Sequence, residues 1–248
     1  MSESTIKINA VVIRSKKSGE NDRLLTLLSP EFGKLSVIAK GACSLRHKDR
    51  SSTVVFTYSS FVLKKIREGF YSLVSAELLE SFKVMTEDVL LLSYAAYLAS
   101  LCEICVSEGM GADEEVRLLL NSFHMLCVRK EAAPLIKCVF ELKLCECAGL
   151  MPEISETCPC GKPASFFSVE NGEVRCTEHS SNYDIKIAPS VLELAMYITQ
   201  SSLKDAMYSS FNQSDAYALW AINERFLEHH MGNLPKSLTY LHDMLKNL

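Results

Sequence analysis

The sequence predicts a chain of mixed class, in which a small β domain precedes an α-helical domain. Turn residues separate short β-branched and aromatic segments in the first 80 residues, whereas the later residues follow a helical pattern with capping residues. The charge changes at the same place. The first 80 residues hold 13 Lys and Arg against 8 Asp and Glu, and the remaining 168 hold 13 against 22. A net charge of −4 is thus +5 followed by −9, which favours a first domain that faces a polyanion.

Composition excludes several classes of protein. With 248 residues, of which 48% are hydrophobic and 23% charged, the chain is typical of a globular protein with a sizeable core. Residues 1–5 contain neither a basic nor an apolar region, so we expect no secretory signal and a cytoplasmic location. The ten cysteines are then expected to be reduced thiols, some of them metal-bound. The apolar run Val89–Val106 contains Glu103 and lacks basic flanks, which favours a buried helix over a membrane span.

The first domain is expected to contain five short strands. They are residues 5–13, 23–28, 34–39, 53–66 and 70–76. Turn clusters lie at residues 18–22, 29–33 and 68–69, and the polar and basic residues 41–52 are expected to form a loop. Strands at this spacing, without helices between them, predict a small sandwich or barrel rather than βαβ units.

Six helices are expected in the later part of the chain. They are residues 86–108, 113–130, 134–149, 190–200, 214–231 and 237–248. Thr86 is a suitable N-cap for the first, because two acids follow it at the positive end of the helix dipole. Pro134 suits the first turn of the third helix. Residues 152–189 have an irregular pattern and contain a cysteine cluster.

That cluster has the residue types of a metal site. It consists of Cys158 and Cys160, then Cys176 and His179 after a stretch in which Asn171-Gly172 predicts a small hairpin. Two short pairs of S and N ligands can supply the tetrahedron that Zn²⁺ prefers, and four protein ligands make a site structural rather than catalytic. The alternatives are a degenerate finger without metal, or two unrelated thiol pairs.

Basic residues on the predicted strands and on the loop at residues 41–52 indicate a nucleic-acid surface. The candidate phosphate contacts are Arg14, Lys16, Lys17, Lys34, Lys40, Arg46, Lys48 and Arg50. The candidate stacking faces are Phe32, Phe56, Tyr58, Phe61 and Tyr71, although a barrel this small needs several of them in its core. Small five-stranded barrels bind single strands with such a combination of cations and aromatic rings. The alternative is a solvated loop over core aromatics.

The sequence contains no recognisable catalytic set. Neither phosphate-binding glycine motifs nor a nucleophile elbow nor a paired-histidine zinc motif is present. The Cys102 and Cys105 pair falls in the most apolar predicted helix, where core thiols are expected instead of a redox centre. We therefore expect a protein that is not an enzyme.

Three stretches resemble the RecO family of recombination mediators. The first is VVIRSKKSGENDRLLTLLSPEFGKLSVIAKGACSLRHK, with Gly19-Glu20-x-Asp22, a Glu31-x-Gly33-Lys34 turn and Lys40-Gly41 before a basic loop. The second, FELKLCECAGLMPE, is similar to a helix that precedes the family's cysteine cluster. The third, FLEHHMGNLPKSLTYL, is similar to the end of the family's chains. The resemblance covers nearly the whole sequence.

The resemblance implies a specific organisation and function. It implies an OB-fold DNA-binding barrel at residues 1–80, a helical domain at 81–150 and 189–248, and a zinc-finger-like insertion at 151–188 with a structural Zn²⁺. It further implies a cytoplasmic, nucleoid-associated protein that binds single- and double-stranded DNA and anneals complementary strands. The implied partners are RecR, RecA and the C-terminal tail of the single-strand binding protein SSB, which RecA is helped to displace.

Two other functions remain open at this point. In one, the barrel is a protein-interaction module whose DNA binding is incidental. In the other, the cysteine pairs form a redox or hydrolytic centre. A strand-annealing assay separates DNA mediation from the interaction module, and metal content with thiol reactivity identifies the enzyme.

Overall fold

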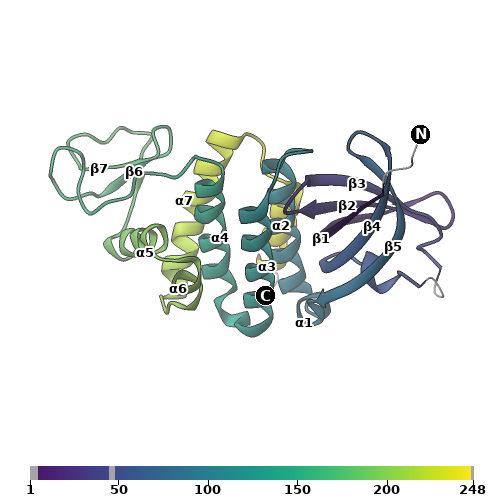
Figure 1. Ribbon diagram of the computed structural model, residues 1–248. Helices are drawn as coiled ribbons and strands as arrows, with labels where there is room; N and C mark the ends of the chain where they lie inside the picture. The colour runs from purple at the N-terminus through teal and green to yellow at the C-terminus, as the bar shows by residue number, and fades with distance from the viewer. Residues whose placement is uncertain (1–4, 45–47, 247–248) are drawn as a thin grey trace. The chain divides into compact units, whose positions relative to one another are not determined.

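The computed structural model describes residues 5–44 and 48–246, and contacts divide the chain into two compact units (Figure 1). The first unit is Met1–Cys127 with Leu241–Leu248, and the second is Val128–Tyr240. Each unit is described by itself below.

Five strands make up the sheet of the first unit. They are β1 (Thr5–Ser18), β2 (Asp22–Ser29), β3 (Gly33–Ala39), β4 (Thr57–Arg67) and β5 (Phe70–Ser81). Their order is β1-β2-β3-β5-β4, and β4 pairs again with β1, so the sheet closes on itself. All neighbours are antiparallel except β3 and β5. The five expected strands are therefore present, with β1 and β5 each five residues longer at their carboxyl ends than the sequence predicts.

The interior of the closed sheet is filled by alternate side chains of its strands. Leu25 and Leu27 on β2, Val37 on β3, and Phe61 and Leu63 on β4 are all fully buried. Since side chains alternate between the two faces of a strand, the residues between them point outward, where the cations lie.

Three helices of the first unit follow the sheet: α1 (Lys83–Glu87), α2 (Val89–Cys105) and α3 (Asp113–Val128). The prediction that Thr86 caps a helix reaching residue 108 is wrong. The short α1 ends at Glu87, and the Oδ1 atom of Asp88 accepts the N–H groups of Leu90 and Leu91 at 3.1 and 3.2 Å. Helix α2 is mostly buried, as expected. Among the described residues, no helix is both long and apolar enough to cross a membrane.

The β2–β3 turn is tied to the segment between α2 and α3 by backbone hydrogen bonds. The N–H of Gly109 donates to Phe32 O at 3.1 Å, and the N–H of Ala112 donates to Pro30 O at 2.8 Å. Gly33 lies at the closest approach, with φ of 61°. A Cβ atom at Gly33 would lie 2.2 Å from the carbonyl oxygen of Met110, so only glycine fits there.

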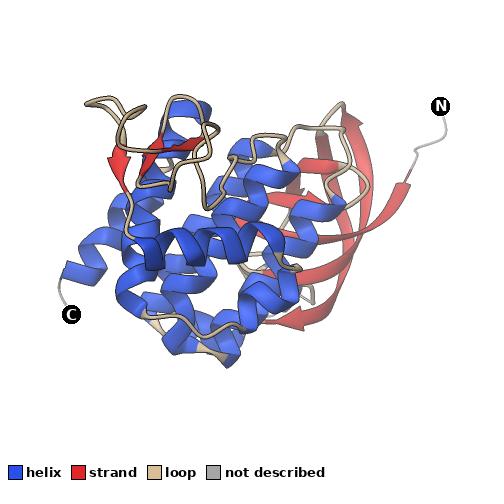
Figure 2. Ribbon diagram, turned by 90° about the vertical axis from the view of Figure 1, so that its left-hand side faces the viewer, coloured by secondary structure: helices blue, strands red, loops and turns tan. Residues whose placement is uncertain are grey.

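The second unit contains four helices of its own and a small sheet (Figure 2). The helices are α4 (Ala133–Cys147), α5 (Pro189–Gln200), α6 (Leu203–Tyr208) and α7 (Gln213–Met231), and α8 (Lys236–Lys246) follows them. The strands are β6 (Phe166–Ser168), β7 (Glu173–Arg175) and β8 (Ile185–Lys186), and the 3-10 turns of the chain are Ser51–Thr53 and Lys130–Ala132. Helix α6 is not predicted from the sequence, because six residues are too few for a periodic pattern.

A buried charged network joins α4 to α7. The Nζ atom of Lys137, which is fully buried, lies 2.6 Å from Glu141 Oε1 and 2.9 Å from Glu224 Oε1. Asn223 donates to Glu141 Oε2 at 3.2 Å, and the Lys137 ammonium sits 3.9 Å from the ring centroid of Trp220. Because each charge has a partner, the network fixes the pairing of the two helices instead of leaving an isolated buried ion.

We predict that Gly33→Ala lowers the free energy of unfolding by at least about 2 kcal/mol, because a left-handed backbone and a steric overlap both oppose the new methyl group. Urea unfolding followed by circular dichroism measures the loss. Gly109→Ala is the matched control, since Gly109 has φ of 74° and open space around it. It should cost only about 1 kcal/mol. Equal losses in the two variants would contradict the steric argument.

Candidate nucleic-acid interface and metal site

The loop after β3 is held against the β1–β2 turn. The N–H of Gly41 donates to Asp22 Oδ1 at 2.8 Å, and the N–H of Cys43 donates to Asn21 O at 2.9 Å. This places Lys40 at the same end of the sheet as Lys16 and Lys17, near the end of β1. All three lysines are exposed. The structure thus brings together three of the predicted phosphate contacts.

The next part of the loop is anchored on β5. Asp49 is buried, and its Oδ1 atom accepts the N–H of Ala76 at 3.0 Å. Its neighbours differ, because Lys48 is exposed whereas Arg50 is half-buried and gives its carbonyl oxygen to Thr53. Arg46, also predicted as a phosphate contact, lies outside the described residues.

Two of the predicted contacts are engaged by α2 instead. The Nζ atom of Lys34 donates to the carbonyl oxygen of Glu103 at 2.9 Å. Glu103 lies in the last turn of α2, where carbonyl groups have no partner within the helix, so Lys34 caps that helix end. Arg14 reaches the carboxylate of the same residue at 3.3 Å. DNA contact by any of the eight residues stays a prediction, but Arg14 and Lys34 already have protein partners.

The aromatic residues named from the sequence are mostly part of the core. Phe61 is fully buried, and Phe56 and Tyr71 are each 5% exposed, so these three are unavailable for stacking. Phe70 was not singled out. It is half-buried at the start of β5, and the guanidinium carbon of Arg67 lies 5.4 Å from its ring centroid. Strand alternation carried the signal, since an inward Tyr71 turns Phe70 outward.

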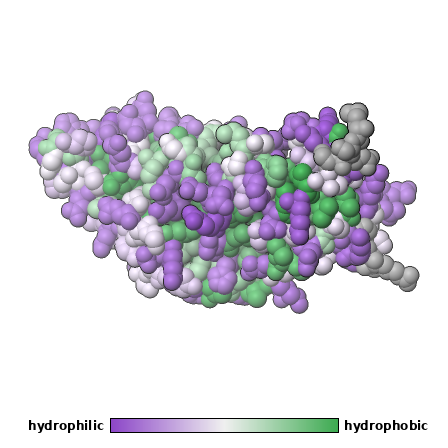
Figure 3. Space-filling view, in the orientation of Figure 1, coloured by the Kyte–Doolittle hydropathy of each residue, from purple (hydrophilic) through white to green (hydrophobic). Residues whose placement is uncertain are grey.

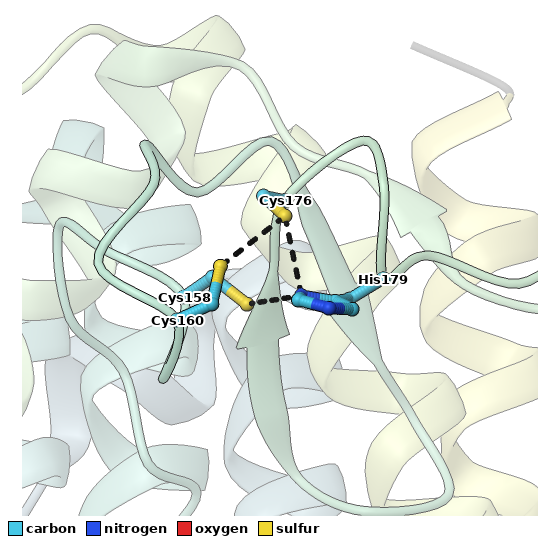
Figure 4. Close-up of side chains that lie close together, drawn as sticks. All are labelled: Cys158, Cys160, Cys176 and His179. Carbon is cyan, nitrogen blue, oxygen red and sulfur yellow. Dashed lines mark hydrogen bonds between the residues drawn. The ribbon is translucent and has the colours of Figure 1, made fainter.

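The four predicted metal ligands lie together in the second unit. The ligand atoms of Cys158, Cys160, Cys176 and His179 are all within 4.8 Å of one another (Figure 4). Cys158 Sγ and Cys176 Sγ lie 3.6 and 3.5 Å from His179 Nδ1, and Cys160 Sγ lies 3.7 Å from Cys176 Sγ. Ligands at tetrahedral zinc distances are about 3.5–3.8 Å apart, so the donor set fits a structural Zn²⁺.

Local structure explains why the two pairs meet. Strands β6 and β7 form the expected hairpin, in which Phe166 lies opposite Arg175, and Cys176 follows directly. In the first pair, the N–H of Gly161 donates to Cys158 O at 2.8 Å, which closes a tight loop around the sulfur atoms. The N–H of His179 does the same for Cys176 at 3.1 Å.

The electrostatics of the cluster favour a cation. The backbone N–H of Cys160 is the main cause that lowers the pKa of the Cys158 thiol to about 6, with help from Cys176 and His179. For Cys160, the backbone N–H of Lys162 favours the thiolate, but burial and the neighbouring sulfur atoms outweigh it and raise the pKa. One thiolate thus opposes the next, and a bound divalent cation removes that opposition because it stabilises every thiolate at once.

The hairpin is packed against α7. The rings of Phe167 and Phe226 lie 5.8 Å apart in an edge-on arrangement, and Phe226 lies 4.3 Å from the ring of His230. His230 Nε2 also forms a hydrogen bond with Val169 O at 2.8 Å. This histidine, interpreted from the sequence as a helix-end residue, therefore holds the hairpin.

Comparisons with known proteins agree over most of the chain. The family described as Recombination protein O N terminal matches residues 1–82, and Recombination protein O C terminal matches residues 86–239. A DNA repair protein RecO from Alkaliphilus metalliredigens is 34% identical over 205 residues, which are 81% of this chain and 83% of that protein. One from Acetivibrio thermocellus is 28% identical over 248 residues, covering 98% and 97%.

We predict that Lys34→Met lowers the free energy of unfolding by roughly 1–2 kcal/mol, because the Glu103 carbonyl loses a charged donor. Lys17→Met, which removes an exposed lysine from the same sheet, is the matched control and should change stability by less than about 0.5 kcal/mol. Urea unfolding compares the two. If Lys34→Met is as stable as Lys17→Met, Lys34 does not cap α2.

Proposed function

Because this chain belongs to the RecO family of DNA repair proteins, we propose that it is a DNA-binding mediator that anneals complementary single strands in recombinational repair. Family membership supports the role in repair and recombination. The annealing activity and its mechanism are our proposal.

The observation that carries the proposal is the group of exposed lysines at one end of the closed sheet. Lys16, Lys17 and Lys40 are gathered there by the bonds between the loop and the β1–β2 turn, and exposed Lys48 follows in the same loop. Cations on one surface release counterions from phosphates and recruit strands without sequence preference. Annealing needs this because two polyanions must be held close together.

We assign the first domain to the OB fold. A closed sheet of five strands, in which β1 pairs with both β2 and β4, supports that assignment. The proposed domains are residues 1–80 for DNA binding, 81–150 with 189–248 for the helical part, and 151–188 for a zinc-finger-like insertion.

The proposed partners follow from the family. They are single- and double-stranded DNA, RecR, the C-terminal tail of SSB, and RecA, which is loaded onto SSB-coated strands with the help of RecR. Annealing makes and breaks no covalent bond, so the protein acts as a mediator and not as an enzyme, and it acts in the cytoplasm with the nucleoid.

We also propose that Cys158, Cys160, Cys176 and His179 bind one structural Zn²⁺. The separation of their ligand atoms supports this, since it suits four bonds to one ion with no position left for substrate. The ion would hold the two short loops together beside the β6–β7 hairpin.

A second candidate function has an observation of its own. Leu78, Leu79 and Val84 are between 38% and 48% exposed, and Glu77 and Glu80 lie among them. An acidic and apolar stretch repels DNA but suits a protein partner. A protein-interaction module with incidental DNA binding is therefore the alternative to be tested.

We predict that the protein accelerates annealing of complementary oligonucleotides, bare or coated with SSB, and that a variant with Lys16, Lys17, Lys40 and Lys48 changed to Gln does not. The variant should also bind single strands with a log–log salt slope smaller by about 2–3, since each lost phosphate contact removes about 0.7. Fluorescence anisotropy over a range of salt concentrations measures the slope.

The matched control changes Lys130, Lys186, Lys204 and Lys246 to Gln, which removes the same charge from other exposed positions. Equal losses in both variants would assign the effect to net charge and not to this surface. A wild-type protein that binds DNA without accelerating annealing would favour the interaction module.

We predict about one zinc per chain in protein made with zinc supplied, and its loss in Cys176→Ser, because three ligands bind zinc less tightly than four. Elemental analysis of the purified protein measures it. Cys147→Ser, which changes a half-buried thiol outside the cluster, should keep the metal. Wild-type protein without zinc would refute the metal site.

A further inference from the structure

The register of the closed sheet aligns outward-facing residues into rows that cross the strands. Arg14 on β1 lies opposite Thr26 on β2, which lies opposite Ser36 on β3. Ser36 lies opposite Phe70 on β5, and Phe70 lies opposite Arg67 on β4. A cation therefore stands at each end of a row whose middle is small and polar, with one aromatic ring beside the second cation.

The next row towards the β1–β2 turn has the same arrangement. Lys16 lies opposite Leu24, Leu24 opposite Ile38, Ile38 opposite Ser72, and Ser72 opposite Lys64. Leu24 and Ile38 are half-buried, so part of each apolar side chain is open to solvent. The two rows together form a strip across β2, β3 and β5 with cations on both sides and apolar surface between. Figure 3 shows hydrophobic surface among hydrophilic surface in the part of the view where Figure 1 labels these strands.

Phe70 is the aromatic ring of this strip. Its neighbour Tyr71 is buried in the core, so alternation places Phe70 on the outside. The Arg67 guanidinium, 5.4 Å from the ring centroid, restricts the ring on one side and carries positive charge next to it. A half-buried ring held by an arginine is a ready surface for a flat, electron-rich group.

Charge alone would not select this place. Lys65 is paired with Glu68 at the β4–β5 turn, and the carboxylate of Glu108 lies beside Gly69. At the other end of the first row, Arg14 is paired with Glu103. The acids offset most of the local positive charge, so a ligand that gains only from phosphate contacts would prefer the β1–β2 end. A base that stacks gains from the ring as well.

We propose that single-stranded nucleic acid crosses this strip with one base stacked on Phe70, Arg67 holding the ring and contacting the adjoining phosphate. The proposal rests on the proposed DNA-binding function and specifies its preference. A duplex keeps its bases stacked on one another, so only an unpaired strand can use the ring. Phe70 therefore gives the surface a preference for single strands, which the lysines do not.

The test measures the dissociation constants of the full chain for a labelled oligothymidine and a duplex of equal length by anisotropy, over a range of salt concentrations. Phe70→Ala should weaken single-strand binding roughly 5- to 150-fold, leave its salt slope unchanged and leave duplex binding unchanged. Arg67→Gln should reduce the single-strand slope by about 0.7. Tyr183→Ala, which removes an aromatic side chain that is 91% exposed, is the matched control and should bind both ligands as wild type does.

Two further variants separate stacking from folding. Phe70→Tyr keeps the ring and should bind single strands within about twofold of wild type, whereas Phe70→Leu keeps apolar bulk and should bind as weakly as Phe70→Ala. Equal single-strand binding by Phe70→Leu and Phe70→Tyr would overturn the stacking role while leaving DNA binding intact. Wild-type protein that binds neither ligand would overturn the proposed function and this inference with it.

Discussion

The closure of the five-stranded sheet is the constraint on which the candidate interface depends. Strand β1 pairs with β4 through its first half and with β2 through its second, and Val11 lies opposite both Tyr58 and Leu28. A shift of one residue in any strand would turn buried side chains such as Leu25 and Val37 outward, so the core sets the register. The positions of the cations follow from that register. They occupy the outward positions that the core leaves to them.

The end of α2 limits how much of this surface is free for phosphate. Lys34 gives its ammonium to the Glu103 carbonyl and Arg14 pairs with the Glu103 carboxylate, while Lys65 pairs with Glu68. A formal +5 over the first 80 residues thus overstates the charge available to DNA. With so few free cations, electrostatic binding is weak and strongly reduced by salt. A mediator of this kind gains from contacts that salt does not screen, such as stacking, and from partner proteins that help to hold the DNA.

The sequence predicts what depends on neighbours in the chain and misses what depends on distant ones. Alternation identified the five strands, and Asn171-Gly172 identified the hairpin. The role of Lys34 could not be predicted, because its partner Glu103 is 69 residues away. Thr86 and Asp88 are both good caps by residue type, and only the fold of α1 decides between them. The boundary near residue 80 marks the change from strand to helix, whereas the compact unit continues through α3, since its packing against the sheet is invisible to periodicity.

The metal cluster shows why local spacing is an incomplete guide to a binding site. Only one residue separates Cys158 from Cys160, yet the short distances join one pair to the other, Cys158 to His179 and Cys160 to Cys176. The relative position of the two loops therefore decides the geometry. That position depends on the β6–β7 hairpin, which Phe226 and His230 of α7 hold in place. Because protein packing already positions the ligands, a bound ion would add stability to an arrangement that the chain forms through its own contacts.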